Sequence, residues 1–145
     1  AYAVGRGLKT LAARMTVHNS NALRLAEWLE TRGNVSRVYY PGLASHPDHA
    51  IATRQMPGGF GGMICIDLGG DYDRAARFYD RLQLFKRAAS LGGTESLISL
   101  PVLTSQWGHT DAQLAAAGVT RGMARLSVGL EDFEDLRADL ESALA

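Results

Sequence analysis

Residues 123–128 read Met123-Ala124-Arg125-Leu126-Ser127-Val128 and give the clearest indication of the fold. This short, largely apolar run predicts a half-buried strand over residues 124–128. Four acidic residues follow within seven positions, and their charge suits the positive end of a helix dipole. Apolar residues recur after them in steps of three and four, so a final helix is predicted directly after the strand: Phe133, Leu136, Leu140 and Leu144.

The same alternation of strand and helix patterns extends back along the chain. Helices are predicted over residues 10–32, 47–56, 72–85 and 110–118, and strands over residues 35–40, 63–68, 88–91 and 96–100. Strands mixed with helices predict an α/β fold of α+β character, in which helices cover a small, mostly antiparallel sheet. No repeat or charge block divides the sequence, so residues 1–145 are interpreted as a single domain.

Composition excludes several classes of function. Fifteen basic residues balance fifteen acidic ones, which gives no electrostatic reason to expect a nucleic acid or an anionic membrane as partner. No apolar run approaches the ~20 residues of a membrane span, and no signal-peptide pattern opens the chain. A single cysteine cannot form an internal disulfide or a multi-thiolate metal site. We therefore expect a soluble, cytoplasmic domain without a bound metal.

Several conspicuous residues have ordinary structural interpretations. The glycine-rich segment 58–62 precedes a strand, so a tight turn or a close backbone contact is favoured over a phosphate cradle. His46 and His49 lack a third ligand at a suitable spacing, which favours a surface helix over a metal site. His18 lies on the apolar stripe of the first long helix and is predicted to be a core or interface histidine. Cys65 is predicted to be an inert core thiol.

Three residues have a better claim to function. Arg125 interrupts the apolar final strand, and a half-buried guanidinium needs a fixed anionic partner. That partner is either Glu95 or Glu131 in an internal ion pair, or a bound carboxylate, and the residues alone leave the two equally open. Ser90 precedes a glycine-rich turn, where a ligand can approach the backbone closely. Ser105 lies in an irregular loop and offers a hydroxyl group beside an aromatic ring.

Motifs along nearly the whole chain resemble one family of enzymes. The resemblance runs in a family-specific order through RGLKTL at residues 6–11, YPGL at residues 40–43, GFGGM at residues 59–63, SLGG at residues 90–93 and RLSVGLED at residues 125–132. In this order the motifs resemble the carboxy-terminal part of the pyridoxal-phosphate enzymes of cysteine and methionine metabolism. The resemblance implies the smaller, carboxy-terminal domain of a fold-type-I enzyme, a sheet with helices packed on one side.

The resemblance also implies roles for the three candidate residues. Arg125 would bind the α-carboxylate of an amino-acid substrate through a bidentate pair, and Ser90 would lie beside the same carboxylate. Ser105 falls where many relatives carry the threonine of a Thr-His pair that contacts the arginine, although Gln106 replaces the histidine here. Ala89 stands where family members that act on cystathionine at Cγ commonly carry a glutamate, which favours methionine, homocysteine or an O-acylhomoserine as substrate.

One absence limits what the chain can do alone. Family members form a Schiff base between pyridoxal 5'-phosphate and a lysine, and neither Lys9 nor Lys86 lies in the matching motif. Without that lysine the catalytic and cofactor-binding residues are missing, so the chain is expected to be inactive by itself. It resembles the carboxy-terminal part of a larger enzyme whose amino-terminal, cofactor-binding domain is its missing partner.

The leading hypothesis is a pyridoxal-phosphate-dependent γ-elimination or γ-replacement on a sulfur-containing amino acid, of the cystathionine γ-lyase, cystathionine γ-synthase or methionine γ-lyase type. The resemblance implies a homotetramer for the whole enzyme. The alternative is a free-standing, non-catalytic domain that binds an amino acid or mediates assembly. A domain separated from its partner should expose an apolar patch, which the helical pattern places along Leu11, Met15, His18 and Ala22.

Overall fold

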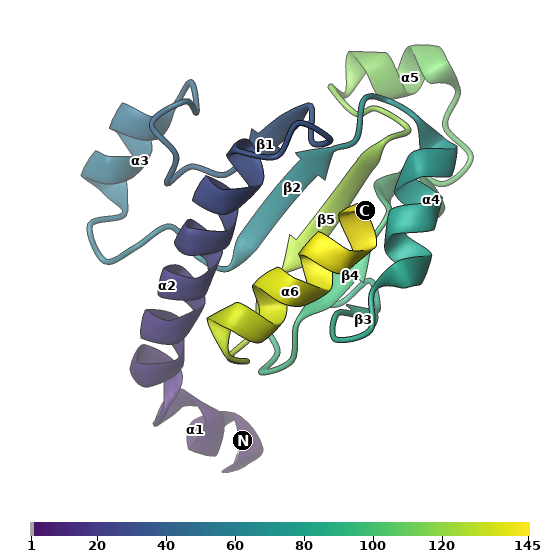
Figure 1. The fold of residues 1–145 in the computed structure, drawn as a ribbon. Helices are drawn as coiled ribbons and strands as arrows, with labels where there is room; N and C mark the ends of the chain where they lie inside the picture. Colours follow the sequence, from purple (N-terminus) through teal and green to yellow (C-terminus); the bar gives the residue numbers. More distant parts are fainter. Residues whose placement is uncertain (1) are drawn as a thin grey trace.

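The computed structural model describes residues 2–145 and contains one sheet with helices packed on it (Figure 1). The helices are α1 (Tyr2–Leu8), α2 (Leu11–Glu30), α3 (His49–Gln55), α4 (Tyr72–Arg81), α5 (Asp111–Ala116), α6 (Phe133–Leu144) and the short 3-10 helix η1 (Pro101–Leu103). The strands are β1 (Arg37–Tyr39), β2 (Met63–Asp67), β3 (Lys86–Arg87), β4 (Leu97–Ser99) and β5 (Met123–Ser127). The predicted α/β fold is confirmed.

Most of the sheet is antiparallel, as predicted. Its strand order is β1-β2-β5-β4-β3, which makes β5 the central strand and β1 and β3 the edges. Three neighbouring pairs are antiparallel and only β3 with β4 is parallel. In the register of the sheet, Arg125 of β5 lies opposite Cys65 of β2 on one side and Ser99 of β4 on the other.

The two faces of the sheet differ in chemistry because neighbouring side chains of a strand point to opposite sides. On the face packed against α2, α4 and α6, β5 places Ala124 and Leu126, both fully buried in the hydrophobic core. We call this side the helical face. On the other side β5 places Met123, Arg125 and Ser127, and the loop of residues 88–96 contacts it. We call that side the loop face.

Two predicted elements end elsewhere for identifiable reasons. The helix predicted over residues 72–85 stops at Arg81, because the Asp139 carboxylate of α6 accepts the backbone N–H groups of Gln83, Leu84 and Phe85. The strand predicted at residues 88–91 is instead β3, which ends at Arg87. Beyond it the chain leaves the sheet and its carbonyls turn toward Arg125.

Other boundaries follow local hydrogen bonds. The helix predicted from Pro47 begins at His49, because the preceding residues form a turn in which the Asp48 N–H donates to His46 Nδ1. Helix α1, which was not predicted, precedes α2. The caps predicted for the other helices are present: the Asp71 side chain accepts from Arg74 N, and Thr110 with Gln113 forms a capping box.

The apolar patch predicted on the first long helix is only partly correct. His18 and Ala22 lie in the core, because α2 turns them toward the sheet and α6. The exposed apolar side chains are concentrated nearer the amino terminus, where no residue of α1 is buried: Tyr2, Val4, Leu8, Leu11 and Val17. Among residues 2–145, no helix combines the length and hydropathy needed to cross a bilayer.

Candidate functional site

Arg125 is held on the loop face with part of its hydrogen-bonding capacity unused. Its Nη2 donates to the carbonyl oxygens of Ala89 at 2.9 Å and Ser90 at 3.0 Å. Its Nε is buried and has no hydrogen-bond partner within residues 2–145. A buried guanidinium donor without a partner is costly, and a planar carboxylate is the group that the guanidinium fork binds best. Because Nε is covered by neighbouring atoms in this structure, a bound anion at Arg125 stays a prediction that rests on the chemistry of the guanidinium.

The internal ion pair considered for Arg125 is absent from the described part of the chain. Both carboxylate oxygens of Glu131 are occupied by Ser96, whose N–H and hydroxyl donate to them at 2.6 Å and 2.8 Å. Glu95 instead accepts from the Thr94 hydroxyl at 3.1 Å. The ion pair with Glu95 or Glu131 is therefore absent among these residues, where the guanidinium is bound by two backbone carbonyls, and a bound carboxylate stays a prediction.

The loop that carries Ser90 lies directly on Arg125. Ser90 is exposed, and its backbone carbonyl is one of the two acceptors of the guanidinium. The loop turns back at Gly92, where φ is +72°, a conformation that favours glycine. The Gly92 N–H then donates to Ser127 Oγ at 3.0 Å, two residues along β5 from Arg125. The structure therefore places Ser90 next to Arg125, as the sequence analysis expected.

Ser105 is not joined to this pair. It is exposed in the turn after η1, and no hydrogen bond links it to Arg125 anywhere in residues 2–145. Its neighbour Gln106 has a buried side-chain oxygen without a partner in the same residues. Trp107 next to it is 73% exposed and lines a hollow of about 380 Å³. A role for Ser105 in substrate binding stays a prediction.

Cys65 lies outside the hydrophobic core to which the sequence analysis assigned it. Its side chain is half-buried on the loop face, opposite Arg125, and does not belong to the core. Burial raises the pKa of the Cys65 thiol to about 11, the charge of Asp67 adds to the rise, and the Arg125 guanidinium opposes it. Because the thiolate is the reactive form, the thiol beside Arg125 stays protonated and unreactive near neutral pH.

The other singled-out residues have structural contacts. His18 is buried, and its Nδ1 lies 2.7 Å from the Val128 carbonyl oxygen, as expected for a core histidine. His49 Nδ1 lies 2.8 Å from the carbonyl oxygen of Pro41. In the glycine-rich segment, a side chain at Gly59 would overlap Asn19, which confirms the predicted close contact. No cluster of three or more possible metal-ligating side chains occurs in residues 2–145.

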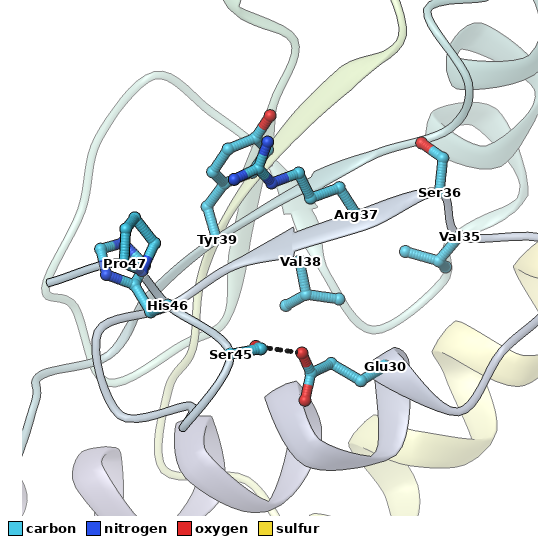
Figure 2. A pocket seen from close by; sticks show the side chains of 9 residues that line it. All are labelled: Glu30, Val35, Ser36, Arg37, Val38, Tyr39, Ser45, His46 and Pro47. Carbon is cyan, nitrogen blue, oxygen red and sulfur yellow. Dashed lines mark hydrogen bonds between the residues drawn. The ribbon is translucent and has the colours of Figure 1, made fainter. Parts of the chain in front are cut away.

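A separate hollow of about 180 Å³ lies at the edge strand β1, away from Arg125 (Figure 2). Two of its polar side chains contact others in the hollow: the Ser45 hydroxyl donates to the Glu30 carboxylate, and the Arg37 guanidinium lies 4.7 Å from the centre of the Tyr39 ring. None of its lining residues belongs to β5 or to the loop of residues 88–96. This hollow is therefore distinct from the Arg125 site.

The two lysines of the chain lie apart from Arg125. Lys9 is exposed between α1 and α2, and Lys86 is exposed in β3, two strands away from β5 in the sheet. The backbone N–H of Gly61, in the glycine-rich segment, is already bound to Asn19 Oδ1 at 2.8 Å. Among residues 2–145, neither lysine therefore lies beside Arg125, and the Gly61 N–H is already used within the chain.

Sequence reasoning missed three contributors to the site: Ser96, Ser127 and the structural use of Glu131. Ser96 and Ser127 are almost completely buried, and both fix the loop of residues 88–96 by hydrogen bonds. The signal was weak because these contacts join residues 35 positions apart. Only the β4–β5 register brings them together, and local patterns do not specify that register.

Comparison with known proteins supplies the context for this geometry. The family model described as Cys/Met metabolism PLP-dependent enzyme matches residues 1–145. The cystathionine beta-lyase of Coxiella burnetii is 51% identical over 144 residues, which are 99% of this chain and 37% of that protein. The cystathionine gamma-synthase 1 of Nicotiana tabacum is 45% identical over 99% of this chain and 26% of that protein.

Solved structures agree with the sequence matches. The cystathionine gamma synthase of Xanthomonas oryzae, determined in complex with cystathionine, superposes with a TM-score of 0.89 at 47% identity. The match covers 96% of this chain and 36% of that one, so the chain spans between about a quarter and little more than a third of the length of these relatives. The fold, the motifs and the match over every residue lead to one conclusion: the chain belongs to the family of pyridoxal-phosphate-dependent enzymes of cysteine and methionine metabolism.

Proposed function

We propose that the chain is the carboxy-terminal, substrate-carboxylate-binding domain of a longer enzyme that performs γ-elimination or γ-replacement on a sulfur-containing amino acid. The observation that carries the proposal is the buried, unpartnered Nε of Arg125 beside two backbone carbonyls that fix the guanidinium. An α-carboxylate would satisfy this donor through a charge-assisted hydrogen bond. The membership of the family supports an amino acid as the ligand.

In this function the described residues bind and orient the substrate. Arg125 would bind the substrate carboxylate and Ser90, exposed on the adjoining loop, would lie beside it. Fixing the carboxylate restricts rotation of the substrate and presents its Cα–H bond in one direction, which is a positioning contribution to the rate. Pyridoxal phosphate supplies electron withdrawal from Cα in enzymes of this family. The described residues do not fit that cofactor, so its binding is assigned to the rest of the polypeptide.

The amino-terminal partner domain and a homotetramer belong to the same proposal. Support comes from the match to only 37% of the Coxiella burnetii relative and from the exposed apolar side chains on and next to α1, such as Tyr2 and Leu8. Exposed apolar surface of this kind is typical of a contact with further protein. We also propose that the enzyme is cytoplasmic, because it would act on a small amino acid of central metabolism. On this view the isolated chain is inactive, because the lysine of the internal Schiff base lies outside it.

Replacement of Arg125 tests the carboxylate role. In the enzyme produced from its complete reading frame, R125A should raise KM for amino-acid substrates by about 10- to 1,000-fold, the scale of a lost charge-assisted pair. R125K keeps the charge but lacks the planar fork, and should restore only part of the affinity. The matched control is R54A, because Arg54 is an exposed helical arginine of α3, remote in sequence from the loop.

Unchanged steady-state kinetics in R125A would contradict the assignment. The mass and absorbance of the same preparation separate the proposal from its alternative. A subunit longer than this chain with a yellow cofactor band supports the enzyme, and profiling with cystathionine, methionine and O-acylhomoserines would then identify the substrate. A colourless 145-residue product would favour a free-standing amino-acid-binding or assembly domain.

A further inference from the structure

The loop that bears Ser90 has no secondary structure of its own and depends on contacts from elsewhere. Residues 88–96 connect β3 to β4 without forming a helix or a strand. An irregular segment keeps one conformation only if its polar backbone groups find fixed partners. The end residues Ala88 and Ser96 make backbone hydrogen bonds to β4 and β3, and the other partners come from β5 and from residues 129–131, which follow it closely.

Glu131 makes the strongest of these contacts. Its two carboxylate oxygens accept from the backbone N–H and the hydroxyl group of one residue, Ser96, at 2.6 Å and 2.8 Å. The Ser96 hydroxyl oxygen in turn accepts from the Gly129 N–H at 2.8 Å. Ser96 is completely buried and Glu131 is half-buried, so loss of the carboxylate would leave two Ser96 donors with reduced access to water.

The surroundings hold Glu131 in place for this contact. The Asn21 side chain of α2 donates to the Glu131 carbonyl oxygen at 2.9 Å, which ties the residue to the helical side of the domain. The Leu130 N–H donates to the Thr94 carbonyl oxygen at 2.8 Å. A side chain at Gly129 would overlap both the Glu131 carboxylate and the Thr94 carbonyl. The segment 129–131 and the end of the loop are therefore in direct backbone contact.

The other end of the same loop meets the substrate site. Gly92 is bound to Ser127, and the carbonyls of Ala89 and Ser90 are bound to Arg125. The loop is thus fixed at one end to the guanidinium and at the other to the Glu131 carboxylate. Five residues separate Ser96 from Ser90, so this short segment is the route by which a shift at Ser96 would reach the carbonyls that orient Arg125.

We propose that Glu131 is a positioning residue of the substrate-carboxylate site, acting through Ser96 and the loop of residues 88–96 on Ser90 and Arg125. This inference rests on the proposed function, because the bound group that the loop positions is the substrate carboxylate. Glu131 makes no ion pair with Arg125 in residues 2–145, so it acts through the loop without contacting the reacting group.

The test uses the enzyme from its complete reading frame and three variants. E131A should raise KM for the amino-acid substrate about tenfold and change kcat by less than about threefold, because ground-state placement of the carboxylate is what the loop supplies. E131Q keeps an acceptor for the Ser96 N–H and should raise KM by about threefold. The matched control E95A removes a neighbouring exposed carboxylate whose single hydrogen bond among residues 2–145 is to the Thr94 hydroxyl, and should leave KM unchanged.

Backbone amide exchange gives a readout that does not depend on activity. E131A should speed exchange in residues 88–96 and leave the β2–β5 amides as slow as in the parent protein, whereas E95A should change neither. This measurement separates the two proposals: if R125A leaves KM unchanged, the proposed function fails, while faster loop exchange in E131A still supports the loop anchor. Faster exchange with unchanged KM overturns the positioning role and leaves a structural one.

Unchanged exchange and unchanged KM in E131A overturn the whole inference. If E131A fails to fold, E131Q carries the test with the same two readouts. An E131Q protein with native loop exchange and native KM then overturns the inference, and a KM raised together with faster loop exchange supports it.

Discussion

The two faces of strand β5 differ in what completes them. On the helical face, Leu126 is fully buried among side chains of this same chain. On the loop face, its neighbour Arg125 has a buried donor for which residues 2–145 offer no acceptor. One side of this strand is thus packed against helices of the same chain, and the other carries a donor without a partner in residues 2–145. The first side accounts for the fold, and the second accounts for the proposed function.

The physical origin of the difference is the kind of interaction each face uses. Apolar burial on the helical face is non-directional, so any well-packed partner satisfies it. A guanidinium is satisfied only by acceptors in its own plane and at hydrogen-bond distance. The loop of residues 88–96 supplies two such acceptors to Arg125 and leaves the buried Nε without an acceptor. On the loop face the guanidinium is therefore held in one position while one of its donors lacks an acceptor among residues 2–145.

Leu126 tests the comparison with the largest expected effect. L126A should lower the free energy of unfolding by about 2–5 kcal/mol, the usual cost of removing a fully buried leucine side chain. R125A, one residue away on the other face, should lower it by about 1 kcal/mol at most, because it removes two partly exposed hydrogen bonds and also one unsatisfied donor. Urea unfolding of the two variants measures both values. A loss in R125A as large as that in L126A would erase the distinction between the faces.

Asp139 sharpens the comparison, because it is a polar residue whose role is structural. Its carboxylate on α6 accepts from the backbone N–H groups of Gln83, Leu84 and Phe85 at 2.9–3.2 Å. D139A leaves all three without that acceptor and should cost about 2–3 kcal/mol of unfolding free energy. Asp139 lies on α6, on the opposite side of the sheet from Arg125, so D139A should raise KM less than E131A does.

Asp135 provides the control for Asp139. It is an exposed acid in the first turn of the same helix, where it interacts with the helix dipole. D135A should therefore cost only about 0.3–1 kcal/mol. Equal losses of unfolding free energy in D135A and D139A would show that the three N–H contacts of Asp139 contribute nothing beyond the interaction of an acidic side chain with the helix dipole.

Much of the helical face could be predicted from the sequence. The periodic apolar residues of α2 and α6, such as Leu25 and Leu140, are fully buried as their spacing indicates. The cap at Asp71 and the capping box at Thr110 were also correct, because both depend on residues within three positions of each other. The predicted end of α4 was wrong, because the carboxylate of Asp139, more than 50 positions later in the chain, determines where the helix stops.

The loop face could be predicted only in part. A charged residue in an apolar strand was enough to single out Arg125, and the glycine turn was enough to single out Ser90. The choice between an internal ion pair and a bound carboxylate required coordinates, because Glu131 is bound to Ser96 through a tertiary contact. Cys65 was assigned to the core because strand alternation does not reveal which of two apolar-looking faces the helices cover.

Cys65 offers the last test, with the smallest expected effect on stability. Its pKa rises from 9.0 to about 11, so at pH 8 about 0.1% of the folded thiol is ionised, against about 10% in the unfolded chain. Alkylation by iodoacetamide should therefore be about 100-fold slower in the folded protein than in 8 M urea. The unfolded chain is its own control, because Cys65 is the only cysteine of the sequence.

The sign of the linked stability follows from the raised pKa of Cys65. The folded state holds the thiol proton more tightly, so the associated stabilisation is fully present below pH 9 and is lost as the pH rises toward 11. Near pH 7 the titration of Cys65 should leave the unfolding free energy unchanged. Equal alkylation rates in the folded and unfolded protein would mean that the Cys65 thiol is exposed to water in the folded state. The loop face would then be more exposed at β2 than the buried Nε of Arg125 on β5 indicates.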